Sequence, residues 1–95
     1  MNELENARNE IEKIDRTMAE LFERRMGISA VIGQYKAENA LPVCDHEREQ
    51  KLTEKNLLYI ENENIKPYYG EFLGKIIELS CKYQQKIIDG RRETK

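Results

Sequence analysis

The sequence has no long apolar run and no excess of positive charge. No stretch approaches the roughly 18 apolar residues of a membrane span, and the charged start at residues 1–3 differs from a secretory signal. The 95 residues include 16 basic and 18 acidic ones, for a formal net charge of −2, whereas a general nucleic-acid binder normally has a strong basic excess. We therefore expect a cytoplasmic protein that binds neither membranes nor nucleic acid.

Cysteine and histidine are also scarce, with Cys44, Cys81 and His46 as their only representatives. Two cysteines make neither a disulfide framework nor a CxxC metal motif, and one histidine does not complete a zinc set with them. We expect buried thiols in a reducing compartment, and neither a metal nor a cofactor. His46 by itself supports no catalytic role.

The sequence lacks β-patterning, low-complexity segments and solenoid repeats, but it contains one long apolar stripe. Ten positions follow one another at gaps of three and four, and nine of them are apolar or aromatic. They are Leu4, Ala7, Ile11, Ile14, Met18, Leu21, Arg25, Ile28, Ile32 and Tyr35. This spacing predicts one long helix, ending near Asn39, with a single face turned away from water.

The length of this stripe indicates the oligomeric state of the protein. At about 1.5 Å per residue it would extend roughly 48 Å, whereas a compact chain of this size has a radius of gyration of about 12 Å. One chain cannot bury such a stripe, so we expect a homodimer with shared cores.

A short second helix is predicted after a connector at residues 40–43, which contains a proline. Asp45 suits the N-cap of this helix. Its apolar residues are Leu52, Leu57 and Ile60. The pattern fades at residues 62–64.

Pro67 suits the first turn of a third helix of medium length. Gly90 should end that helix and leave a frayed tail at residues 91–95. The predicted fold class is therefore all-α, with one domain over residues 1–95 and three helices in the order long, short, medium.

Arg25 interrupts the apolar stripe. An unpaired buried guanidinium is strongly unfavourable, so Arg25 must extend to solvent, be paired, or meet an anion. Lys36 lies on nearly the same side of the helix. Arg8 lies roughly 42 Å from Lys36 along one helix, so it would reach this region only from a second, antiparallel chain. Each cation could instead be an ordinary solvated residue.

Other polar residues lie at positions where a capping box or an apolar helix face would require a different residue type. If Asp45 is the N-cap, a capping box would place Glu or Gln at position 48, but Arg48 stands there and Glu49 is left free. Ser80 and Gln84 are neutral hydrogen-bonding groups on an otherwise apolar face of the third helix. They could bond to each other or to the backbone, or they could face a ligand.

Glycine occurs twice inside the first helix, at Gly27 and Gly33. Each costs about 1 kcal/mol relative to alanine in a helix interior. They are either tolerated weaknesses or points where another helix or a ligand comes close.

These positions form a set with defined spacing. The motifs are Gly33-x-x-Lys36, Pro42-Val43-x-Asp45-x-x-Arg48-Glu49 and Glu78-x-Ser80-x-x-x-Gln84-Gln85, preceded by Arg8, Ile11, Ile14, Asp15 and Arg25. From about Ala7 to Gln85 the chain resembles the all-helical class of chorismate mutases, in particular the small monofunctional bacterial type. The resemblance implies an intertwined homodimer with two equivalent sites, and the rearrangement of chorismate to prephenate in phenylalanine and tyrosine biosynthesis.

The resemblance also implies roles for individual residues. Arg8 of the partner subunit and Arg25 should bind the two carboxylates of chorismate, assisted by Arg48 and Ser80. Lys36 and Gln84 should donate to the ether oxygen. Glu49, helped by backbone near Asp45, should accept from the ring hydroxyl. The apolar walls should be Ile32, Leu52, Ile77 and Cys81.

Two alternatives remain open at this point. An isochorismate-pyruvate lyase uses the same fold, although Gln84 and the connector at residues 40–43 favour the mutase. A non-catalytic helical dimerisation module would explain the apolar stripe but gives no reason for the polar set. No residues remain for a dehydratase, dehydrogenase or regulatory domain, so a free-standing, unregulated mutase is expected.

Overall fold

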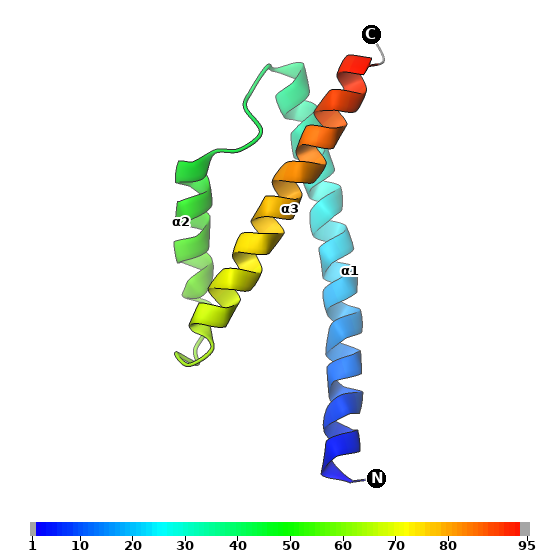
Figure 1. Ribbon diagram of the computed structural model, residues 1–95, viewed down its shortest axis with the longest axis vertical. Helices are drawn as coiled ribbons and strands as arrows, with labels where there is room; N and C mark the ends of the chain where they lie inside the picture. Colours follow the sequence, from blue (N-terminus) through cyan, green and yellow to red (C-terminus); the bar gives the residue numbers. More distant parts are fainter. Residues whose placement is uncertain (1, 94–95) are drawn as a thin grey trace.

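The structure, a computed structural model, describes residues 2–93, with side chains described for residues 2–91. It contains three helices, α1 (Glu3–Glu38), α2 (His46–Leu57) and α3 (Lys66–Glu93) (Figure 1). This confirms the predicted all-α class and the order long, short, medium. None of the helices in the described range is both long and apolar enough to cross a membrane.

Both ends of α1 have recognisable caps. The side chain of Asn2 accepts a hydrogen bond from the Glu5 amide at 2.8 Å and so satisfies a free N–H of the first turn. At the other end the helix stops at Glu38 with Asn39 as its C-cap, which confirms the predicted end near Asn39. Ala40 follows with φ of 53°, in the left-handed region, and the Leu41 amide returns to the Lys36 carbonyl at 2.9 Å. This Schellman-type turn starts the connector toward α2.

Asp45 is the N-cap of α2, as predicted, and its carboxylate accepts from the Arg48 amide at 3.1 Å. The helix ends at Leu57, however, so the expectation that Ile60 belongs to it was wrong. The amides of residues 58–60 bond to carbonyls three residues back, at 3.0 to 3.2 Å. Such bonds tighten the last turn and end the α-helical pattern.

Pro67 lies in the first turn of α3, as predicted, but Gly90 does not end the helix, which continues to Glu93. None of the described glycines has a positive φ, so Gly90 lacks the left-handed conformation that would stop a helix there. The predicted frayed tail is therefore wrong for residues 91–93, and residues 94 and 95 lie outside the described range.

The core is small because α3 is the only element of the described chain that packs against both others. In Figure 1 it crosses the C-terminal half of α1 and lies beside α2, while the N-terminal half of α1 extends away from both. The buried apolar residues are Leu73, Ile77 and Ile88, and the polar residues Ser29, Ser80 and Gln84 are equally buried. Polar groups thus make up an unusually large part of this core.

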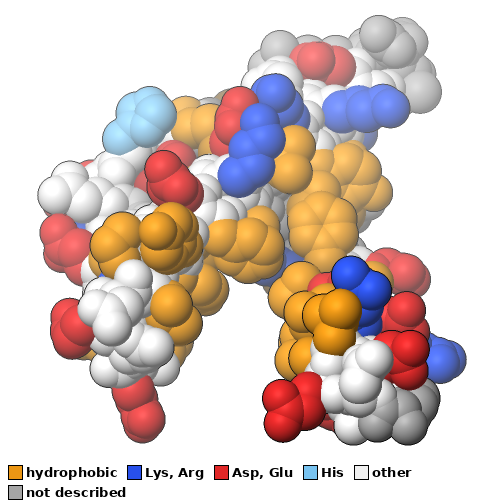
Figure 2. Space-filling view, turned by 60° about the horizontal axis from the view of Figure 1, so that its bottom comes forward, with side chains coloured by type: hydrophobic (Ala, Val, Ile, Leu, Met, Phe, Trp, Pro, Cys, Tyr) orange, Lys and Arg blue, Asp and Glu red, His pale blue; other side chains and the backbone are white. Residues whose placement is uncertain are grey.

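Most of the apolar stripe of α1 is not covered by the part of the chain that the structure describes. Residues 2–24 are all exposed, and the large apolar residues of the stripe retain 37 to 62% of their accessible surface. The radius of gyration is 17.1 Å, against about 12 Å for a compact chain of this length. Figure 2 shows hydrophobic side chains along the hollow between the projecting part of α1 and the rest of the molecule.

Gly33 marks a close approach of α1 and α3. A Cβ atom built there would lie 3.2 Å from Cα and 3.3 Å from Cβ of Gln84. Gly27 differs, because a Cβ at that position meets nothing within 4 Å. Of the two interpretations of these glycines, close approach therefore applies to Gly33, and Gly27 is a tolerated weakness within the chain.

We expect Gly33→Ala to destabilise the protein. Displacing α3 should cost about 2 kcal/mol against a gain of about 1 kcal/mol in helix propensity. Urea unfolding at one protein concentration should therefore show a net loss of about 1 kcal/mol. The matched control is Gly27→Ala in the same helix, which should gain up to about 1 kcal/mol. Stabilisation of both variants would contradict tight packing at Gly33.

Candidate active site

A cavity of about 230 Å³ lies between the three helices and the connector. It brings together all the site residues predicted from the sequence except Arg8. Its lining comprises Arg25, Ile28, Ser29, Ile32 and Lys36 of α1, Val43 and Asp45 before α2, Arg48, Glu49 and Leu52 of α2, and Ile77, Ser80, Cys81 and Gln84 of α3. Segments far apart in the sequence thus contribute polar groups to one small space.

Arg25 of α1 is half-buried and reaches α3. Its Nη1 donates a hydrogen bond to Oγ of Ser80 at 2.5 Å, and Ser80 is only 6% exposed. A neutral hydroxyl orients the guanidinium without neutralising it, and the guanidinium has further N–H groups to donate. The charge that interrupts the apolar stripe is therefore directed toward the cavity and keeps its capacity to bind an anion.

Lys36 joins three parts of the structure. Its ammonium donates to the Val43 carbonyl at 2.5 Å and to Oε1 of Gln84 at 2.9 Å. Because an ammonium only donates, it fixes the amide of Gln84 with the oxygen toward Lys36. The NH₂ group of Gln84, a residue that is 7% exposed, then remains as a donor in the cavity.

The first turn of α2 supplies the opposite charge. The Glu49 side chain is 24% exposed, and its Oε2 is a buried oxygen that accepts no hydrogen bond in the described part of the chain. Nδ1 of His46 lies 3.8 Å from this oxygen, which is beyond hydrogen-bond distance. Arg48 is exposed on the same turn. Asp45 caps the helix and lines the cavity with them.

Ile32, Leu52, Ile77 and Cys81 also belong to the lining and supply apolar surface to it. Burial raises the pKa of the Cys81 thiol to about 12, with a smaller contribution from Cys44, so Cys81 is a neutral wall at physiological pH. Cys44 is exposed, and the expectation that both thiols are buried was wrong for it. Its place in the surface connector accounts for the difference.

Sequence reasoning missed three members of the lining, Ile28, Ser29 and Val43. Ile28 belongs to the apolar stripe, so its helical phase relative to Arg25 was an available signal. Ser29 is 5% exposed and follows Arg25 by one turn. Val43 contributes its carbonyl to Lys36, and a backbone acceptor has no signature in the sequence.

Arg8 and Glu78 lie elsewhere. Arg8 is exposed on the projecting half of α1, outside the cavity of its own chain. Glu78 pairs with Lys75 at 3.1 Å and Lys82 at 3.4 Å on the exposed face of α3. Hydrogen bonding and charge from Lys75, followed by Lys82, lower the pKa of the Glu78 carboxyl. Glu78 therefore takes part in surface ion pairs of α3 and not in the cavity.

A larger hollow of about 710 Å³ lies where the ends of α1 and α3 meet the connector. Its charged residues include Arg91 and Glu38, which pair with each other at 3.2 Å, and it receives no residue from α2. The smaller cavity is the better candidate because its cations are not paired with carboxylates in the described chain.

The small, cation-lined cavity of this all-helical protein has the features of a site for a compact anionic ligand. Comparison with known families specifies the class further. The sequence model of chorismate mutase type II matches residues 7–85, so the chain belongs to this family.

One curated relative supports the same assignment. The chain is 33% identical over 82 residues to a bifunctional chorismate mutase/prephenate dehydratase from Buchnera aphidicola subsp. Acyrthosiphon pisum (strain APS). The match covers 85% of this chain and 21% of that protein, so the chain spans about a fifth of the relative's length. No solved structure gives a significant match.

Proposed function

We propose that this protein is a chorismate mutase, which rearranges chorismate to prephenate in phenylalanine and tyrosine biosynthesis. The observation that carries the proposal is the charge pattern of one cavity. Arg25, Lys36 and Arg48 line it without a salt bridge in the described chain, opposite the unbonded Oε2 of Glu49. Chorismate has two carboxylates for the cations and a ring hydroxyl for Glu49.

The chemistry needs no acid, base or nucleophile from the protein. In the intramolecular [3,3] shift the ether C–O bond breaks while a C–C bond forms between the enolpyruvyl methylene and the ring. The protein must hold the arm over the ring and stabilise the negative charge that develops on the ether oxygen. A roughly 10⁶-fold acceleration requires about 8 kcal/mol of preferential transition-state stabilisation.

Two donors serve the ether oxygen in this proposal. Lys36 and the NH₂ group of Gln84 converge because Lys36 already holds the amide oxygen. A hydrogen bond from a charged group contributes about 1.5–3 kcal/mol, so these two supply only part of the required stabilisation. Enforcing the compact conformer must supply much of the rest.

Carboxylate binding enforces that conformer. Arg25, oriented by Ser80, and Arg48 at the mouth of the cavity suit planar carboxylates because a guanidinium can pair with both oxygens. Glu49 accepts from the ring hydroxyl, with Asp45 and the start of α2 beside it. The apolar walls formed by Ile32, Leu52, Ile77 and Cys81 exclude water and strengthen these interactions.

The proposal includes an intertwined homodimer in which Arg8 of the partner subunit completes each site. The exposure of residues 2–24 supports it, because a lone helical segment of this length is marginally stable without tertiary packing. The exposed apolar residues of the stripe are the surface that a second copy would bury. A cytoplasmic location also belongs to the proposal, since free thiols such as Cys44 and Cys81 are typical of reducing compartments.

The experiment that tests the function is product analysis. We expect the purified protein to remove chorismate absorbance and to yield prephenate, identified by chromatography and mass. Isochorismate, supplied separately, tests the lyase of the same fold. Salicylate and pyruvate as the dominant products would overturn the proposal in favour of that lyase, and no turnover of either substrate would leave only a non-catalytic helical module.

Gln84→Glu should make activity depend on acid. A carboxyl donates to the ether oxygen only when protonated. In the wild type the Lys36 ammonium lies 2.9 Å from the amide oxygen of Gln84. Beside the carboxyl that replaces this amide, the ammonium favours the ionised form and lowers the carboxyl pKa. We therefore expect kcat/KM of the variant to rise steadily as the pH falls toward about 4, the ordinary pKa of Glu. Circular dichroism at each pH verifies that the protein is folded.

The matched control is Gln85→Glu, which adds the same charge one residue further on. Gln85 is exposed and donates to Asp89 at 2.8 Å outside the cavity, so its pH profile should follow the wild type. A wild-type profile for Gln84→Glu would remove Gln84 from its assigned role.

Subunit exchange tests the shared site. Arg8→Ala and Lys36→Ala should each be inactive, but a heterodimer of the two has one site with both residues intact. Random mixing makes half the dimers heterodimers, so about a quarter of wild-type activity should return. As a control, Arg25→Ala mixed with Lys36→Ala should recover none, because both residues belong to the same chain's site. No recovery in the first mixture, despite demonstrated exchange, would contradict a site built from two chains.

A further inference from the structure

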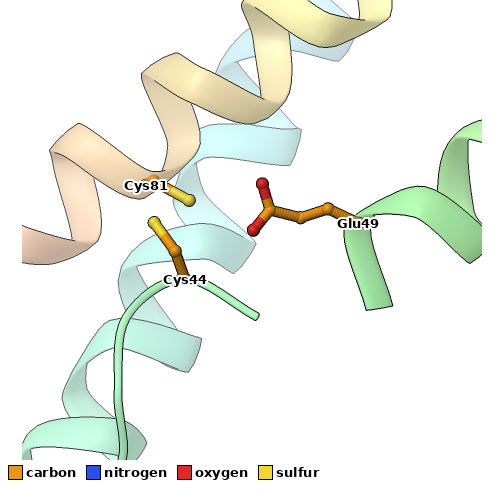
Figure 3. A group of neighbouring side chains, drawn as sticks. All are labelled: Cys44, Glu49 and Cys81. Carbon is orange, nitrogen blue, oxygen red and sulfur yellow. The ribbon is translucent and has the colours of Figure 1, made fainter. Parts of the chain in front are cut away.

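Two cysteines and a carboxylate meet at the edge of the cavity. Cys44 belongs to the connector, Glu49 to α2 and Cys81 to α3, and one ligand atom from each lies within 4.8 Å of the other two. Figure 3 shows the three side chains pointing toward one another. This group is not predictable from the sequence, because the two cysteines are far apart along the chain and form no metal motif.

We infer that Cys44, Glu49 and Cys81 form a binding site for a thiophilic divalent ion, with Zn²⁺ as the ion that fits best. Tetrahedral zinc with bonds of about 2.3 Å to sulfur and 2.1 Å to oxygen places its ligand atoms roughly 3.5 to 3.8 Å apart. The observed spread of 4.8 Å must therefore contract by only about 1 Å. Side-chain rotation of Cys44, in the exposed connector, suffices for a change of this size.

The charges and the access also suit such an ion. Two thiolates and a carboxylate carry three negative charges, so the complex with Zn²⁺ has a net charge of −1. Lys36 in the same cavity offsets this remaining charge. Oε2 of Glu49 accepts no hydrogen bond, so coordination breaks none there. Cys44 is exposed and provides a route from solvent. Binding forms two Zn–S bonds and one Zn–O bond and releases both thiol protons to water.

Three protein ligands leave a fourth position for water, as in open zinc sites. Glu49 and Cys81 line the cavity, so an ion bound to them competes with chorismate for the Glu49 carboxylate. This consequence rests on the proposed function. The ion would act as an inhibitor, and Cys44, which has no role in the proposed reaction, would make the enzyme sensitive to it.

Binding is tested on the full chain without substrate, using Co²⁺ as a spectroscopic substitute for Zn²⁺ and a non-thiol reductant to keep both cysteines reduced. Since Cys44 and Cys81 are the only cysteines, a thiolate-to-Co²⁺ charge-transfer band reports on this group alone. We expect a band that saturates at one Co²⁺ per chain and disappears when Zn²⁺ is added. Absence of the band in the wild type would overturn the site, whatever the activity of the protein.

Two variants identify the ligands. Cys44→Ser should weaken Zn²⁺ binding by more than about tenfold, since even outer-shell changes cost that much. His46→Ala is the control, because His46 is near Glu49 but outside the proposed set, and it should retain the band. Wild-type binding by Cys44→Ser, or loss of the band in His46→Ala, would overturn the proposed ligand set.

The effect on activity is measured separately. Zn²⁺ should raise the apparent KM for chorismate in the wild type, and a chelator should reverse the change. Cys44→Ser should keep the basal rate and require at least about tenfold more Zn²⁺ for the same effect. A cobalt band in a protein without mutase activity would refute the proposed function and leave the site intact. Mutase activity without the cobalt band would refute the metal site and leave the proposed function intact.

Discussion

The hydrogen bonds of Lys36 are the interaction on which the rest of the site depends. One ammonium holds the connector through the Val43 carbonyl and α3 through the amide of Gln84. The connector in turn sets where Asp45 starts α2, and therefore where Glu49 faces the cavity. Removing this charge would release the loop and the amide together, so its effect cannot be divided between structure and ligand binding.

The arrangement has a cost in stability. Buried polar groups require partners, and in this protein Ser80 and Gln84 find them in the cations of α1. Among the described side chains only three apolar residues are buried beside them. Association of the apolar stripe with a second copy would supply the missing hydrophobic burial, and it would free the interior of each chain to hold polar groups. The proposed dimer and the proposed site would then both follow from the same distribution of residues.

The sequence predicts those features that depend on residue type and local spacing. Helical periodicity and the capping side chain of Asp45 were sufficient for α1 and for the start of α2. The limits at Ile60 and Gly90 were not predictable in this way, because a helix ends through backbone conformation, and glycine also adopts ordinary helical angles. Family motifs selected most of the cavity lining. The Val43 carbonyl and the meeting of Cys44 with Cys81 depend on how distant segments cross, which no local pattern records.

Gly33 shows why the two helices must cross where they do. Without a side chain at this position, α3 comes within van der Waals distance at Gln84, and the amide then reaches Lys36, one turn further along α1. A larger residue at this position would push α3 away by a few tenths of an ångström. The amide of Gln84 would then move away from the Lys36 ammonium by a similar distance. Such a shift would lengthen the 2.9 Å hydrogen bond between Lys36 and Gln84, so a glycine that costs about 1 kcal/mol of helix propensity preserves the alignment of the donors. Local helix stability is thus lowered where the site requires α1 and α3 to lie close together.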